Sequence, residues 1–172
     1  MKFYLNQYLP LISFLIIPLL IYWNPSWFSL MGYQANWPIF WLLPWALING
    51  PFKSMLLGFL LGFILDTINA DLYTQIPGLM ICGFWFGKVG SSNQFNNPPL
   101  QFGLTAAIGS LICGVIYFSQ MVVKLSLENS LLEFFSYGVQ NIFAQVFLTS
   151  LLAPVFCKWL YFWFSKKYKL KI

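Results

Sequence analysis

The chain has 172 residues, of which 59% are hydrophobic and 8% are charged, and its mean hydropathy is +0.73. It contains no histidine or arginine, and nine lysines against four acidic residues give a formal net charge of +5. These values exclude a soluble globular domain and are typical of a membrane protein. The lysines lie at the edges of apolar runs rather than in one patch, so nucleic acid is not an expected partner.

Six apolar runs are candidate membrane spans, at residues 8–23, 37–49, 54–66, 76–88, 102–123 and 139–163. The first run resembles the apolar core of a signal peptide, but bulky residues follow it where a cleavage site needs small ones. We therefore expect it to be a retained anchor. The connections are too short to fold alone, so residues 1–172 are predicted to form a single polytopic membrane domain. The predicted fold is an all-α bundle of about six transmembrane helices.

The second run, residues 37–49, is short for a membrane span. At about 1.5 Å per residue it reaches only about 20 Å of a hydrocarbon layer that is ~30 Å thick. Pro44 interrupts the run, and the Asn-Gly-Pro sequence at its end predicts a turn. The second and third runs are therefore predicted to form a hairpin whose tip just reaches the cytosolic face. Lys53 favours that contact, because an ammonium at the bilayer centre costs about 2.5–3.5 kcal/mol.

The distribution of lysines predicts the orientation, because cytoplasmic flanks of membrane spans collect Lys and Arg. With six spans and the N-terminus inside, all the lysines except Lys124 fall on the cytoplasmic side. Lys124 is accompanied outside by Glu128 and Glu133. Both termini are therefore predicted to be cytoplasmic, with residues 165–172 as a short basic tail.

Tryptophans recur at helical spacing in two of the runs. Trp37, Trp41 and Trp45 are one turn apart, and Trp159 and Trp163 lie beside the basic tail. Such rings favour the membrane interface or lipid-facing surfaces. A tryptophan stripe can equally be ordinary packing, so both interpretations stay open at this point.

Small residues recur four positions apart in three consecutive runs. In the third run Ser54, Gly58 and Gly62 share one helical face, which ends at Asp66. Small residues at this spacing let the backbones of membrane helices approach closely. A leucine at Gly62 is therefore expected to disrupt packing, and an alanine at Gly58 to be milder. The predicted helix-packing residues are Gly58, Gly62, Gly83, Gly87, Gly103, Ala107, Ser110 and Gly114.

Polar residues gather at the predicted outer end. Asp66 and Asp71 flank the connection after the third run, and Asn141 and Gln145 lie one turn apart in the sixth run. Amide side chains in hydrocarbon are costly unless they form hydrogen bonds. This face of the sixth run is therefore expected to point into the bundle or at a partner helix, and the four residues are candidates for partner recognition.

Asp66 has three interpretations. It is the exit residue of its helix, accepting hydrogen bonds from nearby groups, or it organises a recognition surface, or it belongs to a proton or ion relay. A relay usually needs several buried ionisable groups, and no second carboxylate lies within an apolar run. The relay is therefore the least favoured interpretation.

No pattern of side chains predicts catalysis, a metal site or a bound cofactor. Cys82, Cys113 and Cys157 lie in three separate apolar runs, which indicates small packing residues rather than a disulfide framework or a thiolate metal site. Serines are present, but none has a visible general base nearby. The sequence therefore predicts a protein that is not an enzyme.

One segment resembles a known family. Residues 36–90, NWPIFWLLPWALINGPFKSMLLGFLLGFILDTINADLYTQIPGLMICGFWFGKVG, combine a Trp-rich second run that ends before a proline, a glycine-spaced third run closing on Asp66, a short loop, and Gly78 opening the next run. This order and spacing resemble the rod shape-determining protein MreD family of bacterial inner-membrane proteins. Two departures are Ala70 and Asp71, where family members often have a glycine, and the use of lysine instead of arginine at cytoplasmic edges.

The resemblance implies a non-enzymatic component of the bacterial elongation machinery, without a cofactor, in the inner (plasma) membrane. The implied partners are the lipid bilayer, an MreC-like protein, the MreB filament system, and the enzymes that build lateral peptidoglycan. An alternative of similar size is the substrate-binding membrane subunit of an energy-coupling-factor vitamin transporter. Such subunits typically dock through small residues four apart in the first helix, and residues 8–23 offer no such pair.

Overall fold

The computed structural model describes residues 29–30, 33–69, 73–92, 99–125 and 131–169. In these ranges a short antiparallel ladder of β1 (Ser29–Leu30) and β2 (Tyr33–Gln34) precedes the helices. The helices are α2 (Trp37–Asn49), α3 (Pro51–Asn69), α4 (Ile76–Ser91), α5 (Pro99–Leu125) and α6 (Leu131–Lys169). The predicted runs from residue 37 onward coincide with these helices, so the helical prediction is confirmed for this part of the chain. The predicted span at residues 8–23 and Asp71 lie outside the described residues.

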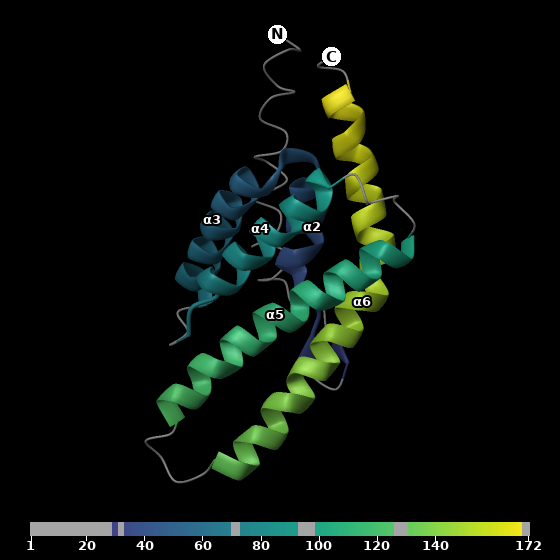
Figure 1. The fold of residues 1–172 in the computed structure, drawn as a ribbon. Helices are drawn as coiled ribbons and strands as arrows, with labels where there is room; N and C mark the ends of the chain where they lie inside the picture. Colours follow the sequence, from purple (N-terminus) through teal and green to yellow (C-terminus); the bar gives the residue numbers. More distant parts are fainter. Residues whose placement is uncertain (1–28, 31–32, 70–72, 93–98, 126–130, 170–172) are drawn as a thin grey trace.

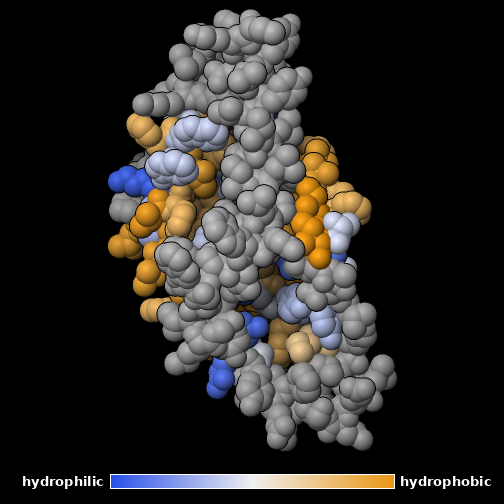
Figure 2. Space-filling view, turned by 180° about the vertical axis from the view of Figure 1, so that it is seen from behind, coloured by the Kyte–Doolittle hydropathy of each residue, from blue (hydrophilic) through white to orange (hydrophobic). Residues whose placement is uncertain are grey.

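Three of the described helices are long and apolar enough to cross a membrane, in the segments Pro51–Ile68, Leu100–Val123 and Gly138–Ser165. Their exposed faces carry large apolar side chains at one-turn spacing, which is the pattern of a lipid-facing helix surface. On α6 this stripe consists of Phe143, Phe147, Leu151, Val155, Trp159 and Phe162. Figure 2 shows hydrophobic residues gathered along both flanks of the molecule. The chain is therefore a membrane protein in contact with the lipid bilayer.

The helices associate as two antiparallel pairs around α2. In Figure 1, α3 lies along α4, and α5 crosses and runs beside α6. The short helix α2 packs against both α4 and α6 and so joins the two pairs.

Most of α2 is buried, which explains how so short an apolar helix fits this fold. The Trp37 ring meets the rings of Phe40 and Phe156 edge-on, and Trp41 stacks on Trp45. Trp37 and Trp41 are buried, whereas Trp159 on α6 is 69% exposed. The first tryptophan stripe is therefore core packing rather than an interfacial belt.

Pro44 lies inside α2, yet the helix continues to Asn49. A proline has no N–H to bond the carbonyl four residues earlier, which here belongs to Phe40. The Cys157 thiol donates to the Phe40 carbonyl oxygen at 3.6 Å, so a side chain of α6 occupies the freed acceptor. The predicted turn after α2 is confirmed at Gly50, where φ is 82°.

The predicted packing glycines of α3 and α4 face each other. A Cβ added at Gly62 would lie 2.6 Å from the Ile76 Cα, and one at Gly87 would lie 2.5 Å from the Pro51 Cα. At Gly58 it would overlap the Leu79 carbonyl oxygen, and at Gly83 that of Ser54. Because these neighbours are backbone atoms, an alanine at Gly58 is itself expected to be disruptive, although less so than a leucine at Gly62.

Three of the predicted packing residues of α5, namely Gly103, Ser110 and Gly114, face α6. A Cβ at Gly103 would lie 3.1 Å from the Ser150 carbonyl oxygen, and one at Gly114 would lie 3.2 Å from the Ile142 side chain. Ser110 is buried and donates to Thr149 Oγ1 of α6 at 3.4 Å, while Ala107 is half-buried. The predicted small residues therefore bring α3 close to α4, and α5 close to α6.

Candidate functional site

Asp66 lies near the end of α3 and caps the beginning of α4. Its Oδ1 accepts the backbone N–H of Gln75, the residue immediately before α4, at 2.8 Å. The first N–H groups of a helix have no partner within the helix, and a carboxylate there is favoured by the helix dipole. Asp66 Oδ2 is buried and accepts no hydrogen bond within the described part of the chain. This geometry matches the first interpretation of Asp66, in which it is the exit residue of its helix and accepts hydrogen bonds from nearby groups.

The segment that enters α4 is held against α5 by a side-chain clamp. The Thr74 N–H donates to Gln120 Oε1 at 2.9 Å, and Gln120 Nε2 donates back to the Thr74 carbonyl at 3.0 Å. Next to it, the rings of Tyr73 and Tyr117 meet edge-on with centroids 5.4 Å apart. The two hydrogen bonds of the Gln120 carboxamide and the ring contact fix the position of residues 73–75 on α5.

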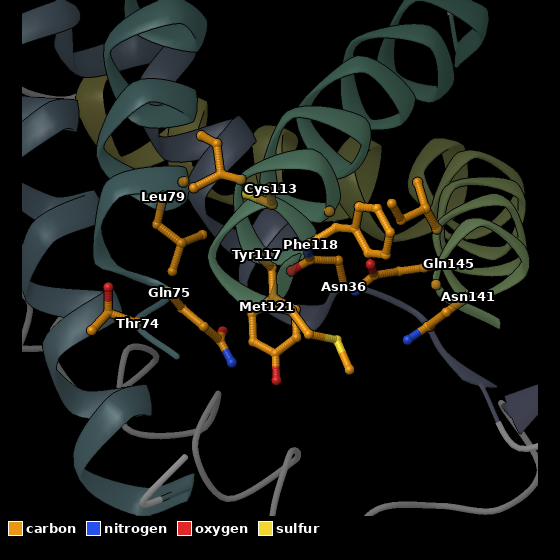
Figure 3. A pocket seen from close by; sticks show the side chains of 15 residues that line it. Asn36, Thr74, Gln75, Leu79, Cys113, Tyr117, Phe118, Met121, Asn141 and Gln145 are labelled. Atoms are coloured by element: carbon orange, nitrogen blue, oxygen red, sulfur yellow. The ribbon is translucent and has the colours of Figure 1, made fainter. Parts of the chain in front are cut away.

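Beside this clamp lies a cavity of about 270 Å³ between the beginning of α4, the second half of α5 and the first half of α6. Its polar lining comes from elements far apart in the sequence, namely Asn36, Thr74, Gln75, Asn141 and Gln145. We call this space the amide cavity. In Figure 3, the side chains of Gln75, Asn36, Asn141 and Gln145 surround one opening.

The amide cavity has an apolar side as well. Leu79, Cys113, Phe118 and Met121 line it, together with the ring of Tyr117. None of the described lining residues carries a formal charge. The cavity thus combines neutral hydrogen-bonding groups with an apolar and aromatic wall, which is the usual composition of a small-molecule site.

The carboxamides of the cavity keep hydrogen-bonding capacity. Each carboxamide offers one acceptor oxygen and an NH₂ donor group. Asn36 and Gln75 donate their backbone N–H groups, rather than their carboxamides, to Thr149 Oγ1 and Asp66 Oδ1 respectively. Within the described residues, the side-chain amides of Gln75, Asn141 and Gln145 form no hydrogen bond. They remain able to bond water or a ligand.

Thr149 links two of the segments that line the amide cavity. Its hydroxyl donates to the Gln145 carbonyl at 2.6 Å and accepts the Asn36 N–H at 3.0 Å. The residue is fully buried, so these bonds replace water that is not available there. Thr149 therefore ties the segment before α2 to the part of α6 that carries Asn141 and Gln145.

The structure brings two of the four predicted recognition residues into the same cavity, since Asn141 and Gln145 both line it. Asp66 is adjacent, because it binds the backbone of the lining residue Gln75. Sequence reasoning missed Asn36, Gln75 and the Gln120 clamp. The only signal was position, since Asn36 and Gln75 directly precede α2 and α4.

Among the described residues, no group of three or more His, Cys, Asp or Glu side chains is arranged to hold a metal ion. Comparison of the chain with protein-family models, with curated proteins and with solved structures finds no match. Function is therefore inferred from the residues and their geometry.

Proposed function

We propose that this chain is a non-enzymatic, multi-pass component of the bacterial cell-shape machinery, related to the MreD family, that scaffolds lateral peptidoglycan synthesis. Its proposed place is the bacterial inner membrane, and its proposed partners are an MreC-like protein, MreB-linked proteins and the wall synthases. The order of features in residues 36–90 supports this proposal. A scaffold of this kind needs no catalytic residues.

The observation that carries the proposal is the α3–α4 pair. The segment with the family resemblance contains the glycines whose backbones meet, and the same pair ends in the Asp66 cap of α4. Backbone contact along two helices makes a stiff unit, because bulky, mobile side chains are absent from the seam. The outer side of α3 exposes Phe52, Leu56, Phe59 and Phe63, a surface suited to neighbouring transmembrane helices or lipid.

We propose that the end carrying Lys53 and Lys88 faces the cytoplasm. Both lysines are exposed, and they share one end because α3 and α4 are antiparallel. In Figure 1 the C-terminal end of α6 lies at the end of the bundle where α2 turns into α3. Asp66 and the amide cavity lie toward the opposite end, which the positive-inside tendency assigns to the outside.

The test is affinity purification of the full chain from native membranes, with identification of partners by mass spectrometry. We expect MreC-like and wall-synthase proteins to copurify with the wild type. If Asp66 and Gln145 belong to one recognition surface, the double variant Asp66→Asn/Gln145→Leu loses more partner than the two single changes predict together. Gln140→Leu is the matched control, because Gln140 is exposed and does not line the cavity. Recovery of no wall-synthesis protein would reject the scaffold.

A second candidate function is the substrate-binding membrane subunit of an energy-coupling-factor transporter. The amide cavity favours it, because a substrate-binding subunit needs a lined space for a small molecule. The same purification separates the two functions. Copurification of ATPase subunits, in place of wall-synthesis proteins, would establish the transporter.

A further inference from the structure

We propose that the amide cavity binds a small, uncharged ring compound that carries hydrogen-bond donors and acceptors on one side. The inference rests on the lining of the cavity and is independent of the scaffold function. A scaffold that senses such a compound and a transporter subunit that captures it would both use this site.

The polar lining selects against charge. Asn36, Gln75, Asn141 and Gln145 each present a carboxamide, which donates and accepts equally well but neutralises nothing. The Asp66 carboxylate is outside the lining and accepts a hydrogen bond from the Gln75 backbone. A charged ligand would leave water without gaining a partner of opposite charge, which is costly in a weakly polar site.

The opposite wall selects for a ring. Tyr117 and Phe118 bring two aromatic side chains to the lining, and Met121 and Leu79 add apolar surface. Flat rings pack against aromatic faces and edges over a large area. An aliphatic chain would leave the carboxamides across the cavity without hydrogen bonds, so the two walls together favour a ring with polar substituents.

The volume sets the size of the ligand. Pockets for drug-sized ligands are about 300–1,000 Å³, and the amide cavity, at about 270 Å³, is slightly smaller. Since a water molecule occupies about 30 Å³ in the liquid, the space corresponds to on the order of ten non-hydrogen atoms. One substituted ring fits this space, whereas a phospholipid or a peptide of several residues does not.

The protein contains its own reporter of occupancy. Cys113 lines the cavity, whereas Cys82 and Cys157 are fully buried. Reaction of Cys113 with N-ethylmaleimide therefore measures access to the cavity, and peptide mass spectrometry identifies which cysteine has reacted. A ligand in the cavity slows this reaction by about tenfold when its concentration is about ten times its Kd.

The probes are three compounds of matched shape: benzamide, which is uncharged, benzoate, an anion, and benzamidine, a cation at neutral pH. The full-length wild type, purified in lipid nanodiscs, is titrated with each up to millimolar concentration, and uracil serves as a second uncharged ring. We expect benzamide or uracil to protect Cys113, and benzoate and benzamidine to leave its labelling rate unchanged. Equal protection by all three matched compounds, or protection by neither uncharged ring, would overturn the proposal.

Two variants locate the binding groups. Asn141→Leu/Gln145→Leu is expected to weaken protection by roughly 10- to 100-fold, the effect of losing one or two hydrogen bonds. Gln140→Leu on the same helix is expected to bind as the wild type does. The labelling rate without probe shows whether each variant keeps the shape of the cavity. Equal binding by the double variant and by Gln140→Leu would place the ligand elsewhere.

A gain-of-function variant covers the case in which the double variant does not fold. Gln145→Glu puts one negative charge into the lining with almost no change of shape. It is expected to admit benzamidine, which the wild type rejects, and to bind benzamide more weakly. If Gln145→Glu folds and shows no gain for benzamidine, Gln145 does not contact the ligand. Because partner purification is a separate measurement, failure here leaves the scaffold proposal standing, and the reverse also holds.

Discussion

The sulfur atoms of Cys82 and Cys113 lie 3.5 Å apart across the contact between α4 and α5. The Cys82 thiol also lies 3.2 Å from the Gly109 carbonyl oxygen, so two helices converge on one buried residue. Treatment of the membranes with copper phenanthroline and oxygen is expected to join the two cysteines in an intramolecular disulfide, as the oxidant takes up two electrons and two protons are released. Non-reducing peptide mass spectrometry detects the bond. The Cys113→Ser variant should form no disulfide between Cys82 and Cys157, and a Cys82–Cys157 bond would contradict the helix arrangement.

Alanine at Gly58 is expected to destabilise the protein by about 1–3 kcal/mol, since the added methyl group overlaps a carbonyl oxygen of α4 that only a helix shift can move. Gly62→Leu should destabilise the protein more than Gly58→Ala does. Gly114→Ala is the matched control, because an added Cβ there lies 3.2 Å or more from side-chain atoms of Ile142 and overlaps no backbone atom. Thermal unfolding in detergent ranks the three variants. If Gly58→Ala and Gly114→Ala unfold at the same temperature, the α3–α4 backbones are not in contact.

Replacement of Thr149 by valine is expected to cost about 1–3 kcal/mol, because the shape is kept while the Asn36 N–H loses its acceptor in a buried place. Thr149→Ser should restore most of the loss. Thr105→Val is the control, since the Thr105 hydroxyl donates to the Gln101 carbonyl of its own helix and so links no second element. Thermal unfolding in detergent measures all three. Equal effects at the two threonines would argue against a link between Asn36 and α6.

Gly50 turns the chain from α2 into α3 with φ 82° and ψ 171°, a conformation that is essentially restricted to glycine. The space around it is open, with Ser91 Oγ 3.9 Å from an added Cβ, so the cost of a substitution is conformational. Gly50→Ala is expected to lower stability by about 1–3 kcal/mol. Gly50→Asn should not restore it, because asparagine tolerates the left-handed helical region and not this one. If Gly50→Ala unfolds at the same temperature as the wild type, the turn has another conformation.

Orientation is tested by single cysteines on a Cys113→Ser background, in which the remaining native cysteines are buried. Ser92→Cys, after α4, should react with a membrane-impermeant maleimide from the cytoplasm. Thr74→Cys and Gln140→Cys, which are exposed in the wild type, should react from outside. Labelling of Ser92→Cys and Thr74→Cys from the same side would contradict a membrane-crossing α4.

The helices could be predicted from the sequence because their signals are local. Apolar runs located α2 to α6, and the Asn-Gly-Pro sequence located the turn at Gly50. The spacing of Gly58 and Gly62 correctly indicated a face for close helix approach. Each of these inferences needs only the periodicity of one helix or the conformational freedom of one residue.

The tertiary structure alone decided which faces meet. Helical periodicity places a residue on a face but carries no information on the partner of that face. Hence the pairing of α3 with α4 through glycine, and the burial of the Trp37 and Trp41 rings by α6, could not be read from spacing. The bond that compensates for Pro44 could not be predicted either. The Cys157 thiol that bonds the freed Phe40 carbonyl lies 117 positions away from it in the chain.

The amide cavity shows the same division between local and tertiary information. Asn141 and Gln145 were recognisable in the sequence because polar amides in an apolar helix are costly and need a partner. Asn36 and Gln75 stand at helix starts, where polar residues are common for local reasons, so nothing in the sequence marked them as neighbours of α6. The crossing of α4, α5 and α6 sets which of these amides share one space, and that crossing depends on the packing of side chains distant in the sequence.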